Sequence, residues 1–176
     1  MRNDAASYVF KDYGPGAFGD FEIDYDINQL INSSGANHQH GIVVLSNSIG
    51  TLDDLLTADG IAFCIGRAAG SWMWKIINLQ DSTNNSTLDF DFIFLDYSEN
   101  IYFRASRTGS SALLKVYSNS NRATHIVSYD ITLPVSTTRY KYLYALCSAD
   151  AFPGSADLPS NAFSMHVKRL KILSYG

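Results

Sequence analysis

The sharpest alternation of hydrophobic and polar side chains lies in the stretch GDFEIDYDIN, residues 19–28. Its apolar members are Phe21, Ile23, Tyr25 and Ile27, and the positions between them are Glu22, Asp24 and Asp26. Alternation over this length predicts a half-buried β-strand, with the apolar side chains turned inward and the three carboxylates turned outward.

Segments of similar character recur along the chain, separated by turns rich in Gly, Asn and Ser. They cover residues 41–47, 60–67, 72–79, 88–96, 100–107, 112–118, 124–133, 139–146 and 162–173. Many short strands joined by such turns are typical of an all-β fold, and we predict a two-sheet antiparallel jelly-roll sandwich. The one helical signal is TLDDLLTADG, residues 51–60, where Thr51 is placed to cap a helix of one or two turns.

The overall composition fits this fold and argues against several partners. A chain of 176 residues with 46% hydrophobic and 13% aromatic side chains predicts one β-rich domain, spanning residues 1–176. The formal net charge is −4 and the basic residues are scattered, so we expect no nucleic-acid partner. No apolar stretch approaches the length of a membrane span, and no apolar leader marks the first residues for secretion.

Three stretches carry a resemblance to a known family. They are YVFKDYGPGAFGDFEIDYDI, IYFRASRTGSSALLKVYSN and RYKYLYALCSAD. The matching positions are Tyr8, Lys11, Asp12, Gly14, Phe18, Asp20, Phe21, Tyr102, Arg107, Gly109, Leu114, Tyr117, Ser118 and Tyr142 through Ser148.

In these stretches the chain resembles the concanavalin A-like lectin/glucanase superfamily, and more narrowly the short laminin-G-like modules of phage, bacterial and environmental sequences. Cys147 stands where those modules usually carry Asn. The resemblance implies two antiparallel sheets packed face to face, one of them concave. The wider superfamily includes lectins, glucanases, adhesion modules and virion proteins, so the resemblance specifies a fold and not a reaction.

The row of three acids has a catalytic counterpart in that superfamily. Glucanases of the laminarinase and lichenase type alternate two glutamates and an aspartate along a strand of the concave sheet, and retaining chemistry needs carboxyl groups about 5–5.5 Å apart. Here the last acid, Asp26, is shorter than the glutamate of those enzymes, and the strand lies at the start of the chain. We therefore interpret the row as a solvated strand face at a sheet edge, with catalysis and cation binding as the alternatives.

If the row is a solvated face, then Glu22→Gln and Asp24→Asn leave every measurable activity unchanged. Stability even rises slightly in that case, because neighbouring like charges repel. Loss of β-glucan hydrolysis in either variant, with the fold intact, would contradict this interpretation.

Two groups of aromatic residues are candidate contacts for a ligand or a partner. Trp72 and Trp74 share one face of a predicted strand, where they either stack on sugar rings or belong to the core. Tyr140, Tyr142 and Tyr144 form a second stripe, which suits a protein interface, a ligand contact or plain sheet packing.

Metal and thiol chemistry have weaker signals. His38 and His40 are spaced as a metal pair in a predicted loop, but no third ligand is assignable. Cys64 and Cys147 lie in apolar runs that suit buried thiols, and their spacing does not decide whether they form a disulfide. We expect no catalytic residue, no metal and no cofactor.

Three functions remain open. The one we favour is a non-catalytic structural or adhesion subunit of a larger assembly, such as the decoration, fibre or tail of a phage or virus particle. Its expected partners are other protein chains, with a host or surface glycan as a further ligand, and its expected location is a virion or an extracellular surface. The alternatives are a free-standing carbohydrate-binding module and a glycoside hydrolase that uses Glu22, Asp24 and Asp26.

Overall fold

The computed structural model describes residues 8–32, 38–55, 58–68, 71–79, 100–133, 138–149 and 163–175. Within these ranges the strands are β1 (Tyr8–Asp12), β2 (Phe21–Asn32), β3 (His38–Ser46), β4 (Gly60–Ala68), β5 (Ser71–Asn78), β6 (Ile101–Thr108), β7 (Ser111–Tyr117), β8 (His125–Thr132), β9 (Tyr142–Ala149) and β10 (Phe163–Tyr175). One helix, α1 (Leu52–Leu55), accompanies them. The predicted strand over residues 88–96 lies outside the described residues.

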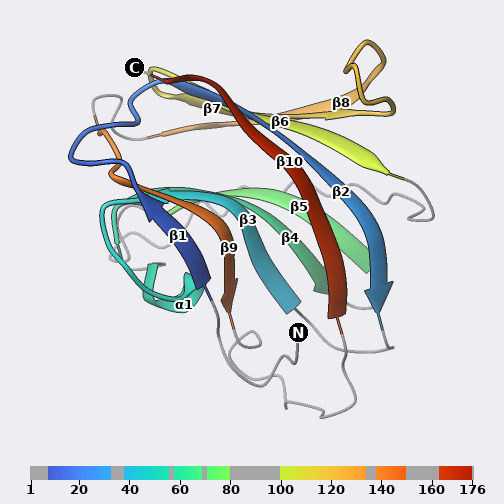
Figure 1. The fold of residues 1–176 in the computed structure, drawn as a ribbon, viewed down its shortest axis with the longest axis horizontal. Helices are drawn as coiled ribbons and strands as arrows, with labels where there is room; N and C mark the ends of the chain where they lie inside the picture. The colour runs from blue at the N-terminus through green and yellow to red at the C-terminus, as the bar shows by residue number, and fades with distance from the viewer. Residues whose placement is uncertain are drawn as a thin grey trace.

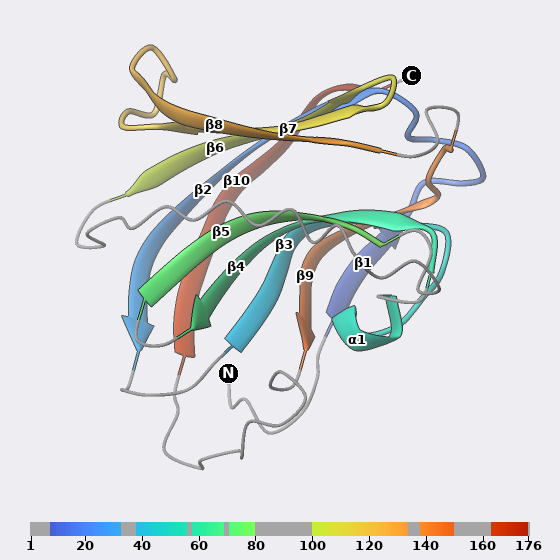
Figure 2. The same cartoon turned by 180° about the vertical axis from the view of Figure 1, so that it is seen from behind.

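The strands form two five-stranded antiparallel sheets, which confirms the predicted two-sheet sandwich. One sheet has the order β1-β9-β3-β4-β5 and the other the order β10-β2-β6-β7-β8. Figure 1 shows the two sheets as stacked layers, with α1 on the side of the first sheet that faces away from the second. Figure 2 shows the same arrangement from behind, with β2 and β10 arching together along the second sheet.

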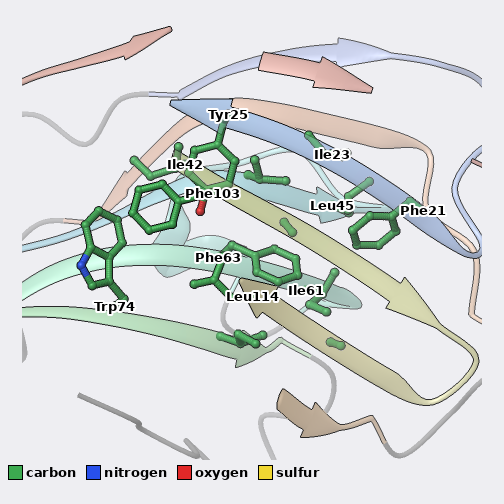
Figure 3. Packing of buried hydrophobic residues seen from close by; sticks show 14 of the residues in the cluster. Phe21, Ile23, Tyr25, Ile42, Leu45, Ile61, Phe63, Trp74, Phe103 and Leu114 are labelled. Atoms are coloured by element: carbon green, nitrogen blue, oxygen red, sulfur yellow. The ribbon is translucent and has the colours of Figure 1, made fainter. Parts of the chain in front are cut away.

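The alternation seen in the sequence decides which side of β2 enters the core. Ile23, Tyr25 and Ile27 are buried between the sheets, as predicted. The Tyr25 ring stacks on Phe103 with centroids 5.0 Å apart, and Trp74 from the opposite sheet packs on the same phenyl ring at 4.3 Å (Figure 3). Each fully buried side chain of this size contributes about 1.5–3 kcal/mol to folding.

A second, smaller hydrophobic cluster lies on the outer side of the first sheet, beneath α1. Leu52 and Leu55 of the helix pack there against Val44 and Tyr144 of the sheet. The predicted cap is present, because Thr51 Oγ1 accepts a hydrogen bond from the Asp54 N–H at 3.2 Å.

Two local expectations were wrong. Strand β1 was not predicted, because its five residues are mostly exposed and do not alternate between apolar and polar side chains. His38 and His40 lie in strand β3 rather than in a loop, since this strand begins before the apolar run that predicted it.

Phe103 packs against Trp74 of the opposite sheet, so its removal gives a test of the core. We expect Phe103→Ala to lower the free energy of unfolding by about 3–5 kcal/mol, through lost apolar contacts and the cavity left behind. The exposed Ile126 of β8 is the matched control, and we expect Ile126→Ala to change that free energy by less than about 1 kcal/mol. Urea denaturation measures both, and similar losses would contradict the described packing.

Candidate functional site

The three acids lie in the middle of a sheet. Strand β2 is hydrogen-bonded to β10 on one side and to β6 on the other, so the prediction of a sheet edge was wrong. The acids point to the outer face, away from the core. Asp24 stands opposite Arg104 of β6 and Asp26 opposite Tyr102 in the strand register, which sets basic and aromatic side chains beside the row.

The prediction of a solvated face was also wrong, since Asp24 is 7% exposed and Asp26 only 4%. Arg104 of β6 pairs with Asp24 and Glu22. Its Nε and Nη2 donate to the two oxygens of Asp24 at 2.7 and 3.0 Å, and its Nη1 lies 3.2 Å from Oε1 of Glu22. The bonds to Asp24 raise the pKa of Arg104, so this side chain is charged at every physiological pH.

A second arginine reaches the row from the turn between β7 and β8. The Nε of Arg122 lies 3.2 Å from Oδ1 of Asp24, and its Nη2 donates to Oδ1 of Asp26 at 2.8 Å. The same guanidinium donates to the backbone carbonyls of Phe103 and Tyr25. Arg122 has a φ of 55°, a left-handed conformation that is uncommon for residues other than glycine.

A third arginine, Arg169 of β10, also contacts the row of acids. The Nε of Arg169 lies 2.7 Å from Oδ2 of Asp26. Its φ is 52°, so both of the described non-glycine residues with positive φ place their side chains on Asp26. Strained backbone of this kind persists where surrounding contacts hold it, and it clusters at functional sites. We name the set formed by Glu22, Asp24, Asp26, Arg104, Arg122 and Arg169 the arginine–carboxylate network.

The network has a definite chemical character. Three carboxylates alternate with three guanidinium groups, so the charges compensate one another. General acid–base catalysis needs a carboxyl group that exchanges a proton with a substrate. In the network each acid is ion-paired to at least one arginine, an arrangement better suited to a fixed array of hydrogen-bonding groups.

The structure places the predicted contact residues elsewhere. Trp74 is buried in the core between the sheets, while the side chain of Trp72 lies outside the described part of the structure. Tyr140 belongs to the same inner core, whereas Tyr142 and Tyr144 are buried in the cluster beneath α1. The role of these residues as ligand or partner contacts stays a prediction, and burial within the chain gives it no support.

The three tyrosines do not share a face, because the strand begins only after Tyr140. Phe18 and Tyr140 pair through an isolated bridge, and the backbone bends at Lys141 before β9 starts at Tyr142. Tyr144 has a structural hydroxyl, which donates to the Ser48 carbonyl at 2.8 Å.

Arg104 and Arg107 lie on opposite faces of β6, as their spacing predicts. Arg107 is buried, donates to the carbonyls of Gly109 and Thr138, and lies over the Tyr140 ring, which makes it structural. The predicted strand over residues 100–107 contains Arg104, but nothing in the sequence pairs Arg104 with the acids. Arg122 and Arg169 gave no signal either, since Arg122 lies between predicted strands and Arg169 lies within the predicted strand over residues 162–173.

No family model and no curated protein sequence matches this chain. Solved structures share its fold. Scytalido-glutamic peptidase with a transition-state analogue inhibitor has a TM-score of 0.57 at 11% identity, covering 99% of this chain and 82% of that one. The alginate lyase from Klebsiella pneumoniae has a TM-score of 0.54 at 14% identity, covering 89% of this chain and 60% of that one.

A functionally unknown protein from Saccharomyces cerevisiae has a TM-score of 0.52 at 14% identity, covering 97% of this chain and 76% of that one. For the alginate lyase the covered share is 60%, so this chain spans less than two thirds of that protein's length. At these identities the likeness shows the fold alone, and it agrees with the two-sheet sandwich. Within the described residues, no helix is long and apolar enough to cross a bilayer.

The burial of the network can be tested by substituting two acids of strand β2 and measuring stability. Asp26→Asn removes the charge that pairs with Arg169 and one of the two carboxylates that pair with Arg122, and we expect a loss of about 3 kcal/mol in the free energy of unfolding. Glu22→Gln is the matched control, because this acid is 38% exposed at its side chain and its pair contributes about 0.2–1 kcal/mol. Denaturant titration of both variants at neutral pH measures the difference. Equal effects would contradict the buried network.

Proposed function

We propose that this chain is a non-catalytic binding module that recognises a glycan on the outer face of the β10-β2-β6-β7-β8 sheet. The observation that carries the proposal is Tyr102, a half-buried aromatic side chain beside the network. In the register it stands between Asp26 of β2 and Tyr117 of β7. Arg104 and Lys115 form the next row of the same face.

The chemistry of this face suits a sugar. A saccharide offers an apolar face of C–H groups to an aromatic ring and hydroxyl groups to charged side chains. Binding sites for such ligands combine aromatic surface with a few well-placed polar groups. Here Arg104 and Arg122 are already held by Asp24, so their side chains lose little conformational freedom when a ligand binds.

The same ion pairs support a binding role over hydrolysis. A retaining glycosidase needs one carboxylate free to attack and one carboxylic acid to donate a proton. Asp24 and Asp26 are engaged by arginines, and Glu22 shares Arg104 with Asp24. These ion pairs therefore favour a protein that binds a saccharide without cleaving it.

A second candidate is the structural or adhesion subunit of a larger assembly, including the laminin-G-like module of phage type and a virion or extracellular location. The resemblance in sequence supports it. One feature of the fold also favours it, namely the edge strand β1, where Tyr8 and Val9 are exposed. Exposed apolar edges are sites where another chain adds a strand. Light scattering that finds only monomers at high concentration would argue against self-assembly.

The glycan proposal is tested by removing the aromatic ring. We expect Tyr102→Ala to weaken binding to the best ligand of a glycan array by about tenfold, which corresponds to about 1.4 kcal/mol. Tyr8→Ala is the matched control, since it removes an exposed tyrosine from the other sheet and should leave the affinity unchanged.

Titration calorimetry measures both variants, with thermal unfolding to check the fold. Absence of binding to any glycan by the unaltered chain would overturn the proposal. Release of reducing sugar from a β-glucan would overturn its non-catalytic part.

A further inference from the structure

The outer face that carries the network has a surplus of positive charge. Strands β10, β2, β6 and β7 and the 118–124 turn hold three acids in all, and these are the three acids of the network. The basic side chains on this outer face are Arg104, Lys115, Arg122, Lys168, Arg169 and Lys171. They are six of the 13 lysines and arginines of a chain whose net charge is −4.

The lysines of β10 belong to this face by register. Lys168 stands opposite Asp26, and Lys171 stands opposite Asp24. Both side chains are exposed, whereas Val167 and Ile172 pack against the core. Among the described residues, Asp130 of β8 is a further acid on this face, where it stands opposite Leu113 of β7.

A β-bulge brings Arg169 to the same face as the two lysines. In a regular strand Arg169 would follow the outward Lys168 and point into the core. The register of β10 against β2 shifts between Lys168 and Lys171, and the left-handed conformation of Arg169 lies within this shift. Bulges re-aim side chains in this way, and the left-handed position is usually occupied by glycine. An arginine here is disfavoured by its backbone conformation, because its Cβ lies close to the following carbonyl oxygen.

The need to neutralise Asp26 does not by itself explain why Arg169 occupies this left-handed position. Arg122 already compensates Asp26 from a position where its side chain is 12% exposed, whereas the side chain of Arg169 is 66% exposed. The Nε of Arg169 lies 2.7 Å from Oδ2 of Asp26, and this ion pair anchors the guanidinium. Because the side chain is mostly exposed, the guanidinium is open to a ligand from solvent. A guanidinium held in this way is prepared for two parallel hydrogen bonds to a carboxylate or sulfate.

We propose that Arg169, flanked by Lys168 and Lys171, binds the carboxylate or sulfate groups of an anionic saccharide. This inference rests on the proposed glycan-binding function and names the class of glycan. A saccharide is favoured over a nucleic acid for two reasons. The cations alternate with three acids instead of forming a continuous basic stripe, and Tyr102 offers a ring beside them.

The test compares four probes on the full chain. Polygalacturonate carries carboxylates, dextran sulfate carries sulfates, laminarin is a neutral glucan, and a DNA duplex represents nucleic acid. We expect binding to one or both of the anionic saccharides, with laminarin and the duplex at least about tenfold weaker.

Three variants separate a guanidinium clamp from general attraction between charges. Arg169→Gly removes the guanidinium and suits the left-handed backbone, so the bulge is retained. Arg169→Lys keeps the charge but loses the fork of donors. Lys11→Gln removes one exposed positive charge from β1 of the other sheet and serves as the control.

We expect Arg169→Gly and Arg169→Lys to weaken binding to the anionic saccharide by about tenfold, and Lys11→Gln by less than about twofold. Full affinity in Arg169→Lys would overturn the clamp, as would equal losses in Lys11→Gln. Tighter binding to the duplex than to either polysaccharide would overturn the class of ligand. Binding to laminarin alone would overturn this inference while leaving the glycan proposal standing, and absence of binding to all saccharides would overturn both.

Discussion

Two nearly buried carboxylates on the outer face of a β-sheet are the constraint to which much of this structure responds. Asp24 and Asp26 cannot stay charged at such low exposure without cations and hydrogen-bond donors close by. Arg104 of the neighbouring strand pairs with Asp24, and Arg122 from a turn that is distant in sequence pairs with Asp26. The ion pairs therefore set the position of the turn as well as the charge of the face.

The arrangement of these ion pairs coincides with unusual backbone conformations. Arg122 and Arg169 both adopt left-handed conformations, and both place a guanidinium on Asp26. The side chain of Arg122 is mostly buried, and the side chain of Arg169 is mostly open to solvent. A network built only for stability gains little from the open one, since exposed ion pairs contribute little. This contrast between the two arginines is the physical basis for assigning a ligand to the face.

The two sheets divide their roles. The first sheet packs against the inner core on one side and carries the cluster beneath α1 on the other, and Tyr142 and Tyr144 are buried in that cluster. In the described part of the chain, the second sheet packs on the same core through one side, and its other side presents Tyr102 among charged residues. A rigid sheet with one free polar face is a suitable platform for a glycan, because side chains on strands are held more precisely than side chains on loops.

The sequence by itself determined the strands that alternate, the side of β2 that enters the core, the cap at Thr51 and the opposite faces of Arg104 and Arg107. Each of these follows from a local period or a local hydrogen bond, which neighbouring residues decide. The tertiary structure alone decided that β2 lies inside a sheet, that Tyr140 separates from Tyr142, and that Asp26 meets Arg122. Asp26 and Arg122 are 96 residues apart along the chain. No periodicity carries information over such a span, because the partner of a charge is selected by the folding of the whole chain.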